Sequence, residues 1–410
     1  MMTTQTQQPS SPPRPNFFQL QSAANPFPLF AQMRAQGAVI PVSSAAGSGF
    51  GKVWMVTQLA EAVQVLKDKR FTVDATAINP NAGAFGQMGG ASATDTNFFG
   101  GRSMISVDGA DHARLRGLVS KAFTPRYIET LRPQIQAIAD ELLDQVQGQG
   151  TMDLVRDYAY PLPINVISRM LGVPSDRRDN LRQWSASMAS GGSRGDLRAF
   201  AAYIMQLVAE KRQQPQDDLI SQLIHLKAEG DALDEQELLS MVGLLIFAGH
   251  ETTSNLISIG TLTLLDHPET LARLKADLSL VPAAVEELLR HNGPVLTPAP
   301  RFAREDVELG GVPIQRGDML MVSLGSANHD ESVFTDPEEL AIARDLSRHI
   351  AFGQGVHFCL GAPLARLEGE IAFTTLLQRM PNLRLAVPRD SVTWRGSLNL
   401  RGLTTLPVAF

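Results

Sequence analysis

The chain has 410 residues and a mass of 44.5 kDa, and its 42 acidic and 36 basic residues leave a net charge of −6. An acidic chain is a poor partner for phosphate backbones, so nucleic acid is excluded as the main ligand. The single cysteine, Cys359, excludes an intramolecular disulfide, a cysteine-rich zinc site and a cysteine-ligated iron–sulfur cluster. A chain of this length buries a large core without such cross-links.

The first segment, residues 1–15, is polar and rich in proline, with no apolar stretch of the kind that a signal peptide carries. It cannot bury enough apolar surface to fold, so we expect a disordered tail at 1–15 and a single domain over 16–410. No apolar run reaches the roughly 20 residues that a membrane span needs. We therefore expect a cytoplasmic protein without a membrane anchor.

A polar segment follows at 79–101, rich in Gly, Ala, Asn and Ser, with Phe85 among its aromatic residues. A loop of this length inside a compact protein is usually either functional or disordered. Two interpretations stay open from the segment alone. It is either a lid whose aromatic residues face a ligand, or a surface loop.

The pattern from Asp111 to Leu288 is mostly helical, with breaks at Pro and Gly clusters. Short strand-like runs follow at 306–309, 312–314 and 319–324, one more helix begins after Cys359, and strands return before Phe410. We predict a mainly α fold with a minor β-rich region.

One long helix is predicted to cross the core. Asp234 and Glu237 have the spacing of a capping box, and the residues that follow, up to Leu265, carry no charge apart from His250 and Glu251. About 31 residues make a helix of roughly 46 Å. A helix that is apolar nearly all round runs through the core, so we expect Glu251 to lie deep inside the protein.

The middle of this helix suits a ligand site. Ala248 and Gly249 leave one face bare, and Thr252 presents a hydroxyl one turn after Ala248. A buried carboxylate such as Glu251 often marks a functional site. The alternative is a satisfied core glutamate in a kinked helix, and these residues alone leave both open. A zinc protease is excluded because Ser254 stands where the His-Glu-x-x-His motif needs its second histidine.

The segment 352–361 surrounds the cysteine with glycines, just before a helix that begins near Pro363. The free amides and dipole of a helix N-terminus favour thiolate over thiol. A fixed thiolate with donors around it suits a soft metal centre. The alternative for a lone cysteine is a small buried hydrophobe.

Five positions here, Phe352, Gly355, His357, Cys359 and Gly361, match the pattern Phe-x-x-Gly-x-His/Arg-x-Cys-x-Gly. The chain thereby resembles the cytochrome P450 superfamily of haem-thiolate monooxygenases, and most closely its soluble bacterial members. The resemblance covers nearly the whole chain after the tail. It implies the cytochrome P450 fold, with the long central helix over a haem b whose iron is bound by the Cys359 thiolate.

The resemblance also assigns an ion-pair network and the contacts of the haem. Glu287 and Arg290 are similar to the family's Glu-x-x-Arg helix, and Arg344 stands where a second arginine bridges to that glutamate. Residues implied to bind the haem propionates are His112, Arg116, Arg301 and His357. Those implied to surround the haem are Ala248, Gly249, Phe352 and Gly361.

By the same resemblance, Thr252 steadies the bound dioxygen and Glu251 supplies protons from solvent. The implied reaction inserts one oxygen atom of dioxygen into a C–H bond, by hydroxylation or epoxidation. A peroxygenase driven by hydrogen peroxide is one alternative, although this chain keeps the acid–alcohol pair that such enzymes replace. A non-catalytic haem-thiolate sensor is the other, although no output domain is seen.

The expected substrate is a mostly hydrophobic small molecule of secondary metabolism. Residues expected to contact it are Phe85, Leu244, Ala248, Val295, Leu296 and Leu398. Electrons are expected from a separate ferredoxin with its reductase, or from a flavodoxin, delivered to a monomer. Candidates for a basic docking patch are Arg114, Lys121, Arg126, Arg348 and Arg366.

Overall fold

The computed structural model describes residues 25–42, 51–80, 103–189, 193–225, 233–396 and 399–410. The predicted tail at 1–15 lies outside these ranges, as do most of the 79–101 segment with Phe85, and Leu398.

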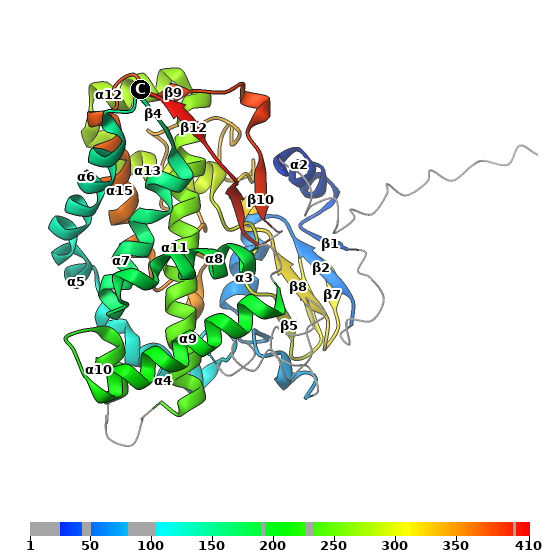
Figure 1. Cartoon of the computed structure of the whole chain (residues 1–410). Coiled ribbons are helices and arrows are strands. Elements are labelled where there is room, and N and C mark those ends of the chain that lie inside the picture. The colour runs from blue at the N-terminus through cyan, green and yellow to red at the C-terminus, as the bar shows by residue number, and fades with distance from the viewer. Residues whose placement is uncertain (1–24, 43–50, 81–102, 190–192, 226–232, 397–398) are drawn as a thin grey trace, which may run out of the picture.

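Helices make up most of the described chain, and most of them gather on one side of the molecule, while α2 and α3 lie beside the strands on the other (Figure 1). The mainly α fold with a minor β-rich region is confirmed. The helices are α2 Phe27–Gln36, α3 Leu59–Lys67, α4 Gly109–Ser120, α5 Pro125–Thr130, α6 Arg132–Gln147, α7 Pro161–Leu171, α8 Arg178–Ala189, α9 Arg194–Gln213, α10 Leu219–His225, α11 Glu235–Asp266, α12 Pro268–Ala276, α13 Val281–Asn292, α14 Leu324–Ala327 and α15 Ala362–Arg379.

The strands form a five-stranded sheet on the other side and three smaller pairings. In the five-stranded sheet the order is β1–β2–β8–β5–β3, with β2 and β8 parallel and the other neighbours antiparallel. β6 pairs with β7, β10 with β11, and β12 lies between β4 and β9. The strands are β1 Val39–Pro41, β2 Val53–Val56, β3 Phe71–Thr72, β4 Thr151–Asp153, β5 Arg301–Ala303, β6 Val307–Leu309, β7 Val312–Ile314, β8 Met319–Val322, β9 Arg384–Leu385, β10 Trp394–Gly396, β11 Arg401–Leu403 and β12 Pro407–Ala409.

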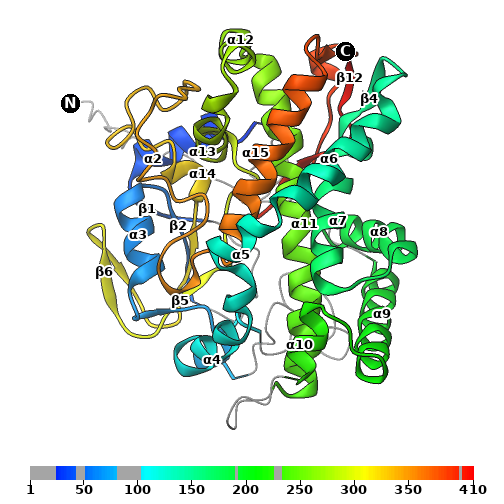
Figure 2. The ribbon, with the colours of Figure 1, turned by 90° about the vertical axis from the view of Figure 1, so that its left-hand side faces the viewer.

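The long helix α11 forms the centre of the helical side, and α15 packs beside it (Figure 2). Its N-terminus is closed by the predicted capping box, in which Asp234 accepts from the Glu237 amide and Glu237 accepts from the Asp234 amide. Most residues of α11 are buried, because apolar side chains cover it all round and α7, α13 and α15 pack on it. The prediction that Glu251 lies deep inside the protein is confirmed, since its exposed fraction is 0%.

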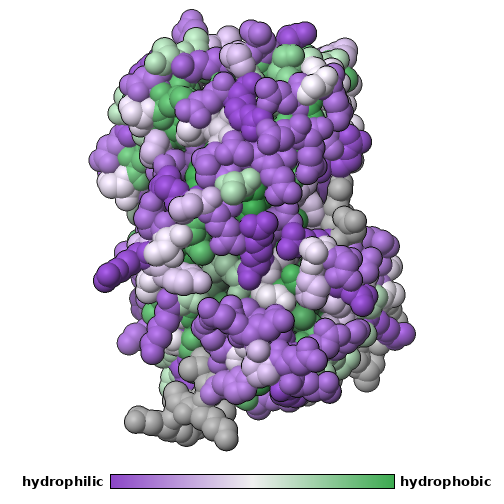
Figure 3. Space-filling view, turned by 60° about the vertical axis from the view of Figure 1, so that its left-hand side comes forward, coloured by the Kyte–Doolittle hydropathy of each residue, from purple (hydrophilic) through white to green (hydrophobic). Residues whose placement is uncertain are grey.

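The surface over the helical side is mostly hydrophilic, with small, separate hydrophobic patches (Figure 3). Within the part of the chain that the structure describes, no helix combines the length and apolar character that crossing a bilayer requires.

Candidate active site

A cavity of about 320 Å³, here called the main cavity, lies between α11, the cysteine loop at 352–361 and the segment that joins α13 to β5. Cys359 lies on its wall together with Ala248 and Thr252 of α11. A smaller cavity of about 160 Å³ shares Ala248, Gly249, Cys359 and Gly361 with it. The larger apolar residues of the main cavity wall are Leu66, Val73, Ile105, Phe123, Leu256, Leu289, Pro294, Val295, Pro298, Leu324, Phe352 and Leu364.

The cysteine loop has a tightly folded backbone. Gly353 and Gly355 have backbone φ angles of 71° and 74°, which residues other than glycine rarely adopt. A Cβ on Gly355 would also lie 2.5 Å from the carbonyl oxygen of Leu66 on α3. The Cys359 amide donates to the Phe352 carbonyl at 2.9 Å, which closes the loop. The two glycines therefore allow a conformation that presents the sulfur to the cavity.

The Cys359 side chain is exposed to the cavity while protein surrounds it on its other sides. Burial raises the pKa of the Cys359 thiol, although the amides of Gly361 and Ala362 and the charges of Arg116 and Arg366 act in the opposite direction. The expected effect of the amides at the helix N-terminus is present, and burial opposes it. A metal cation at the sulfur would supply the missing stabilisation, so this site fits a metal-bound thiolate.

Basic side chains lie beside the two cavities: Arg301 and His357 line the main cavity, Arg116 and His357 line the smaller one, and His112 lines neither. The rings of His112 and His357 lie 4.2 Å apart between centroids. Burial and the neighbouring charges of His357 and Arg116 lower the pKa of His112 to about 4, and its buried Nε2 has no hydrogen-bond partner among the described residues. Burial also lowers the pKa of Arg301, to about 10. The pKa of Arg116 is lowered by burial as well. Arg301 donates to the Ala299 carbonyl at 2.7 Å, and Arg116 to that of Phe358 at 2.8 Å.

Among the described residues, Asp108 is the carboxylate that contacts these basic side chains. Its Oδ1 lies 2.8 Å from His357 Nε2, and its Oδ2 accepts from Thr72 Oγ1 at 2.6 Å and from the Val73 amide at 2.8 Å. Burial raises the pKa of Asp108, but hydrogen bonds from His357 and Thr72 hold it far below its usual range. Sequence reasoning missed this residue, although an acid directly before the helix of His112 was a usable signal. With one carboxylate beside Arg116 and Arg301, this group of side chains suits a ligand with further carboxylates, such as the two of haem.

On α11, Ala248 is exposed to the cavity, and the Thr252 hydroxyl donates to the Ala248 carbonyl at 3.0 Å. Gly249 borders both cavities, but a Cβ added to it would lie 2.9 Å from Cγ1 of Ile167 on α7. The glycine therefore also permits the close packing of α7 on α11, which the sequence did not indicate.

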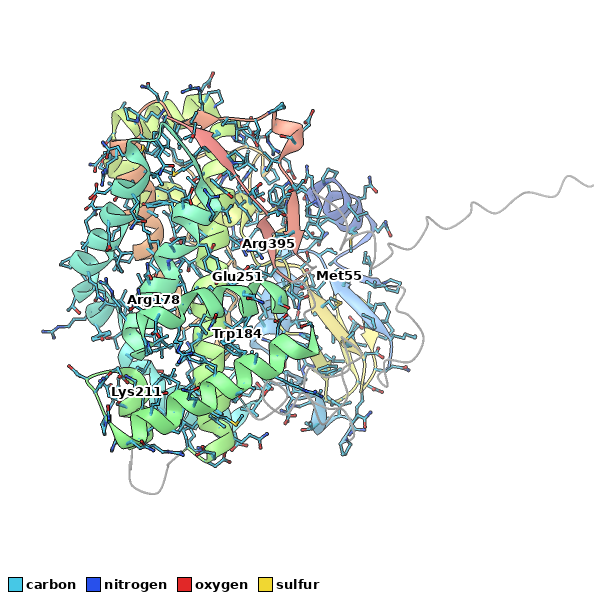
Figure 4. The ribbon with its side chains drawn as sticks, in the orientation of Figure 1. Met55, Arg178, Trp184, Lys211, Glu251 and Arg395 are labelled. Carbon is cyan, nitrogen blue, oxygen red and sulfur yellow. The ribbon has the colours of Figure 1, made fainter. Side chains whose placement is uncertain are left out.

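Glu251 points away from the two cavities, since it lines neither wall. Its Oε1 lies 2.6 Å from Nη2 of Arg395, a residue of β10 (Figure 4). Successive helical residues project about 100° apart, so Glu251 and Thr252 face different sides of α11. Arg395 was missed from the sequence, because nothing in its local pattern distinguishes it from a solvated strand residue.

The expected ion-pair network is formed on the far side of the cysteine loop. Arg290 donates from Nε and Nη2 to the two oxygens of Glu287 at 2.7 and 2.8 Å, and both side chains are fully buried. Arg344 adds a longer contact of 3.4 Å to Glu287 Oε1. The stronger partners of Arg344 are the carbonyls of Thr335 and Asp336.

The expected substrate contacts have mixed outcomes. Val295 and Ala248 line the main cavity, and Leu244 lines the smaller one. Leu296 lines neither, because its side chain packs in the core with Phe30 and against Gly325, which corrects that expectation. Phe85 and Leu398 lie outside the described residues.

The candidates for a basic patch are not equally available. Arg114 binds both oxygens of Glu237, one of them at 3.1 Å, and Arg366 binds Glu286 at 2.6 and 2.8 Å. The exposed members of the set are Lys121, Arg126 and Arg348.

Comparisons with known proteins agree with this geometry. The family profile described as Cytochrome P450 matches residues 194–392. Cytochrome P450 CYP107DY1 of Priestia megaterium is 45% identical over 373 residues, which cover 88% of this chain and 90% of the relative. The polyketide biosynthesis cytochrome P450 PksS of Bacillus subtilis is 42% identical over 94% of this chain and 96% of its own.

The crystal structure of myxobacterial cytochrome P450 CYP267B1 in complex with myristic acid superposes with a TM-score of 0.87 at 39% identity, covering 95% of this chain and 97% of that one. The family and the fold predicted from the sequence are confirmed. The chain therefore belongs to the cytochrome P450 family of monooxygenases.

Proposed function

We propose that the main cavity would hold haem b, with the Cys359 thiolate binding its iron. The observation that carries this proposal is the sulfur, which faces the same cavity as Ala248 and Thr252 and is flanked by two backbone amides. The family binds haem through a cysteine thiolate and uses dioxygen and redox partners. The bound haem supplies dioxygen activation and the oxidant for the C–H bond.

The residues of the chain bind the haem and control protons. His112, Arg116 and Arg301 bind its propionates, and His357 assists from its bond to Asp108. The two buried arginines and the unpartnered Nε2 of His112 support that assignment. Ala248 and Gly249 leave room for the flat ring, while Phe352 and Gly361 border it near the sulfur. Buried Glu287 and Arg290, together with partly exposed Arg344, hold the segment behind the loop.

Thr252 and Glu251 form the proposed proton relay. The Thr252 hydroxyl holds a proton at Oγ1 on the cavity wall, and Glu251 brings protons to it from the far side of α11 through water. This pair favours dioxygen over hydrogen peroxide as the oxygen source, because peroxide brings its own protons. The peroxygenase alternative is therefore not favoured.

The substrate is proposed to be a mostly hydrophobic small molecule, hydroxylated or epoxidised in secondary metabolism. Support comes from the apolar cavity wall and from two relatives, one named for polyketide biosynthesis and one bound to myristic acid. A separate ferredoxin with its reductase, or a flavodoxin, would deliver electrons to a monomer in the cytoplasm. Exposed Lys121, Arg126 and Arg348 are the candidates for its docking.

The ligand assignment is tested by spectroscopy of the purified haem protein and of Cys359→His. The parent should show the thiolate-type ferrous–CO spectrum, and the variant should lose it while remaining folded by circular dichroism. Survival of that spectrum in Cys359→His would disprove the assignment. A titration of the parent with fatty acids and macrolactones, followed by the ferric spin-state change, then tests the substrate class.

A further inference from the structure

The C-terminal hairpin of β10 and β11 lies directly against the middle of α11. Arg395 and Gly402 are opposite each other in its register. A Cβ on Gly402 would lie 2.3 Å from Asn255 Oδ1, so a larger residue here would displace the Asn255 side chain or the hairpin. Arg395 then reaches Glu251 Oε1 at 2.6 Å and Asn255 Oδ1 at 3.3 Å, and its Nε donates to the Leu403 carbonyl at 3.1 Å.

The other edge of the hairpin joins the wall of the main cavity. Leu400 forms a bridge with Val295, and the Arg401 amide donates to the Pro294 carbonyl at 2.8 Å. Val295 and Pro294 both line the cavity. The hairpin therefore connects the cavity wall on one side with Glu251 on the other.

Arg395 is the charged partner of Glu251. The neighbouring His250 lies 3.8 Å from Glu251 Oε2, but its Nδ1 bonds the Ile246 carbonyl at 2.6 Å and its Nε2 lies 3.1 Å from the Tyr160 hydroxyl. Burial lowers the pKa of His250, so this ring is neutral at pH 7. Glu251 Oε2 has no hydrogen-bond partner among the described residues.

We propose that Arg395 is a positioning residue for the proton relay, and that the hairpin holds it in place against Glu251. The inference rests on the proposed function, in which Glu251 supplies protons to Thr252. In each transfer, the carboxylate takes one proton from bulk water on the side of the partly exposed Arg395. It passes this proton through water to the Thr252 hydroxyl, which releases its own proton into the cavity. The carboxylate then returns, unprotonated, to Arg395.

The test uses the haem-loaded protein with NADPH and a surrogate ferredoxin and reductase, without organic substrate. The measured quantity is the ratio of hydrogen peroxide to water formed per NADPH, which reports proton delivery whatever the natural substrate is. Because a general acid contributes roughly 10²–10⁴-fold, Glu251→Gln should raise this ratio by roughly 10²-fold. Arg395→Gln should raise it by roughly tenfold, because the acid is kept but misplaced. Arg395→Lys, which keeps the charge, should return it towards the parent value.

Arg389→Gln is the matched control. Arg389 is another arginine of the C-terminal segment, and it also forms an ion pair with α11. Its Nε lies 2.8 Å from Asp266 Oδ1, but this pair lies on the surface. The peroxide ratio of this variant should equal that of the parent. All variants should keep the thiolate-type ferrous–CO spectrum, which shows that the haem site is intact.

A double variant separates positioning from structural support. Arg395→Gln should have no further effect in the Glu251→Gln chain. If it raises the ratio by the same factor in both backgrounds, Arg395 does not act through Glu251 and the inference is wrong. If Glu251→Gln itself leaves the ratio unchanged, the relay of the proposed function is wrong instead. Gly402→Ala keeps Arg395 but disturbs its contact with Asn255 on α11. It should raise the ratio in the parent and not in Glu251→Gln. This variant provides the test if the Arg395 variants do not fold.

Discussion

The buried pair of Glu287 and Arg290 offers a prediction whose size follows from the contacts. Besides its two bonds to Glu287, Arg290 donates to the carbonyls of Asn328 and Pro337 at 2.9 Å and of Glu339 at 3.1 Å. Arg290→Gln would leave Glu287 with the Ala341 amide at 2.8 Å and the longer contact to Arg344. Breaking a fully buried pair costs about 3–5 kcal/mol, and several carbonyls lose their donor as well.

We therefore expect Arg290→Gln to lower the free energy of unfolding by about 3–5 kcal/mol, a large part of the ~5–15 kcal/mol of an ordinary domain. Urea titrations followed by circular dichroism at equal haem occupancy measure the change. Arg290→Lys keeps the charge but loses the bidentate hydrogen bonds, so its free energy of unfolding should lie between those of the parent and Arg290→Gln. The surface variant Arg389→Gln should change stability by less than about 1 kcal/mol. A loss below 1 kcal/mol for Arg290→Gln would refute the reasoning.

Two more predictions concern stability. Burial raises the pKa of Glu286, but hydrogen bonds from Arg366 and His349 outweigh it and lower the pKa from 4.5 to about 2. Stability from this carboxylate is present above pH 4.5 and lost as the pH falls towards 2, so Glu286→Gln should remove about 2 kcal/mol of acid sensitivity between pH 5 and pH 3, measured by urea titrations. Equal sensitivity in both chains would contradict this. Gly249→Ala should lower the melting temperature, because overpacking against Ile167 costs ~1–3 kcal/mol while alanine gains only ~1 kcal/mol in a helix. Ile167→Ala should relieve that strain in the double variant, and a Gly249→Ala protein more stable than the parent would contradict the packing argument.

The parts of the fold that the sequence predicted are those set by neighbouring residues. The expected helix from Asp234 is observed as Glu235–Asp266, because its cap and its stop are both local signals. The cysteine loop was predictable for the same reason, since its glycines and the following helix lie within a few residues of Cys359. Periodicity also predicted the burial of Glu251, because a helix that is apolar all round has no exposed face.

What escaped prediction depends on contacts between distant segments. Leu296 and Val295 are adjacent and equally apolar, yet one packs in the core and the other lines the cavity. The direction of each side chain follows from the strand-like bridge between Val295 and Leu400, which no local pattern indicates. The packing of Ile167 against Gly249 is hidden for the same reason, since only the approach of α7 reveals it.

The two carboxylates next to the proposed haem site lead to one conclusion about how the chemistry is encoded. Asp108 is held by His357 and Glu251 by Arg395, and in each case the partner comes from a segment far along the chain. Short motifs therefore determine which groups are present, whereas these long-range pairs determine where each charge points. Relatives with the same Glu251–Thr252 pair but a different residue at the position of Arg395 should accordingly deliver protons with different efficiency, which comparison of their peroxide ratios would reveal.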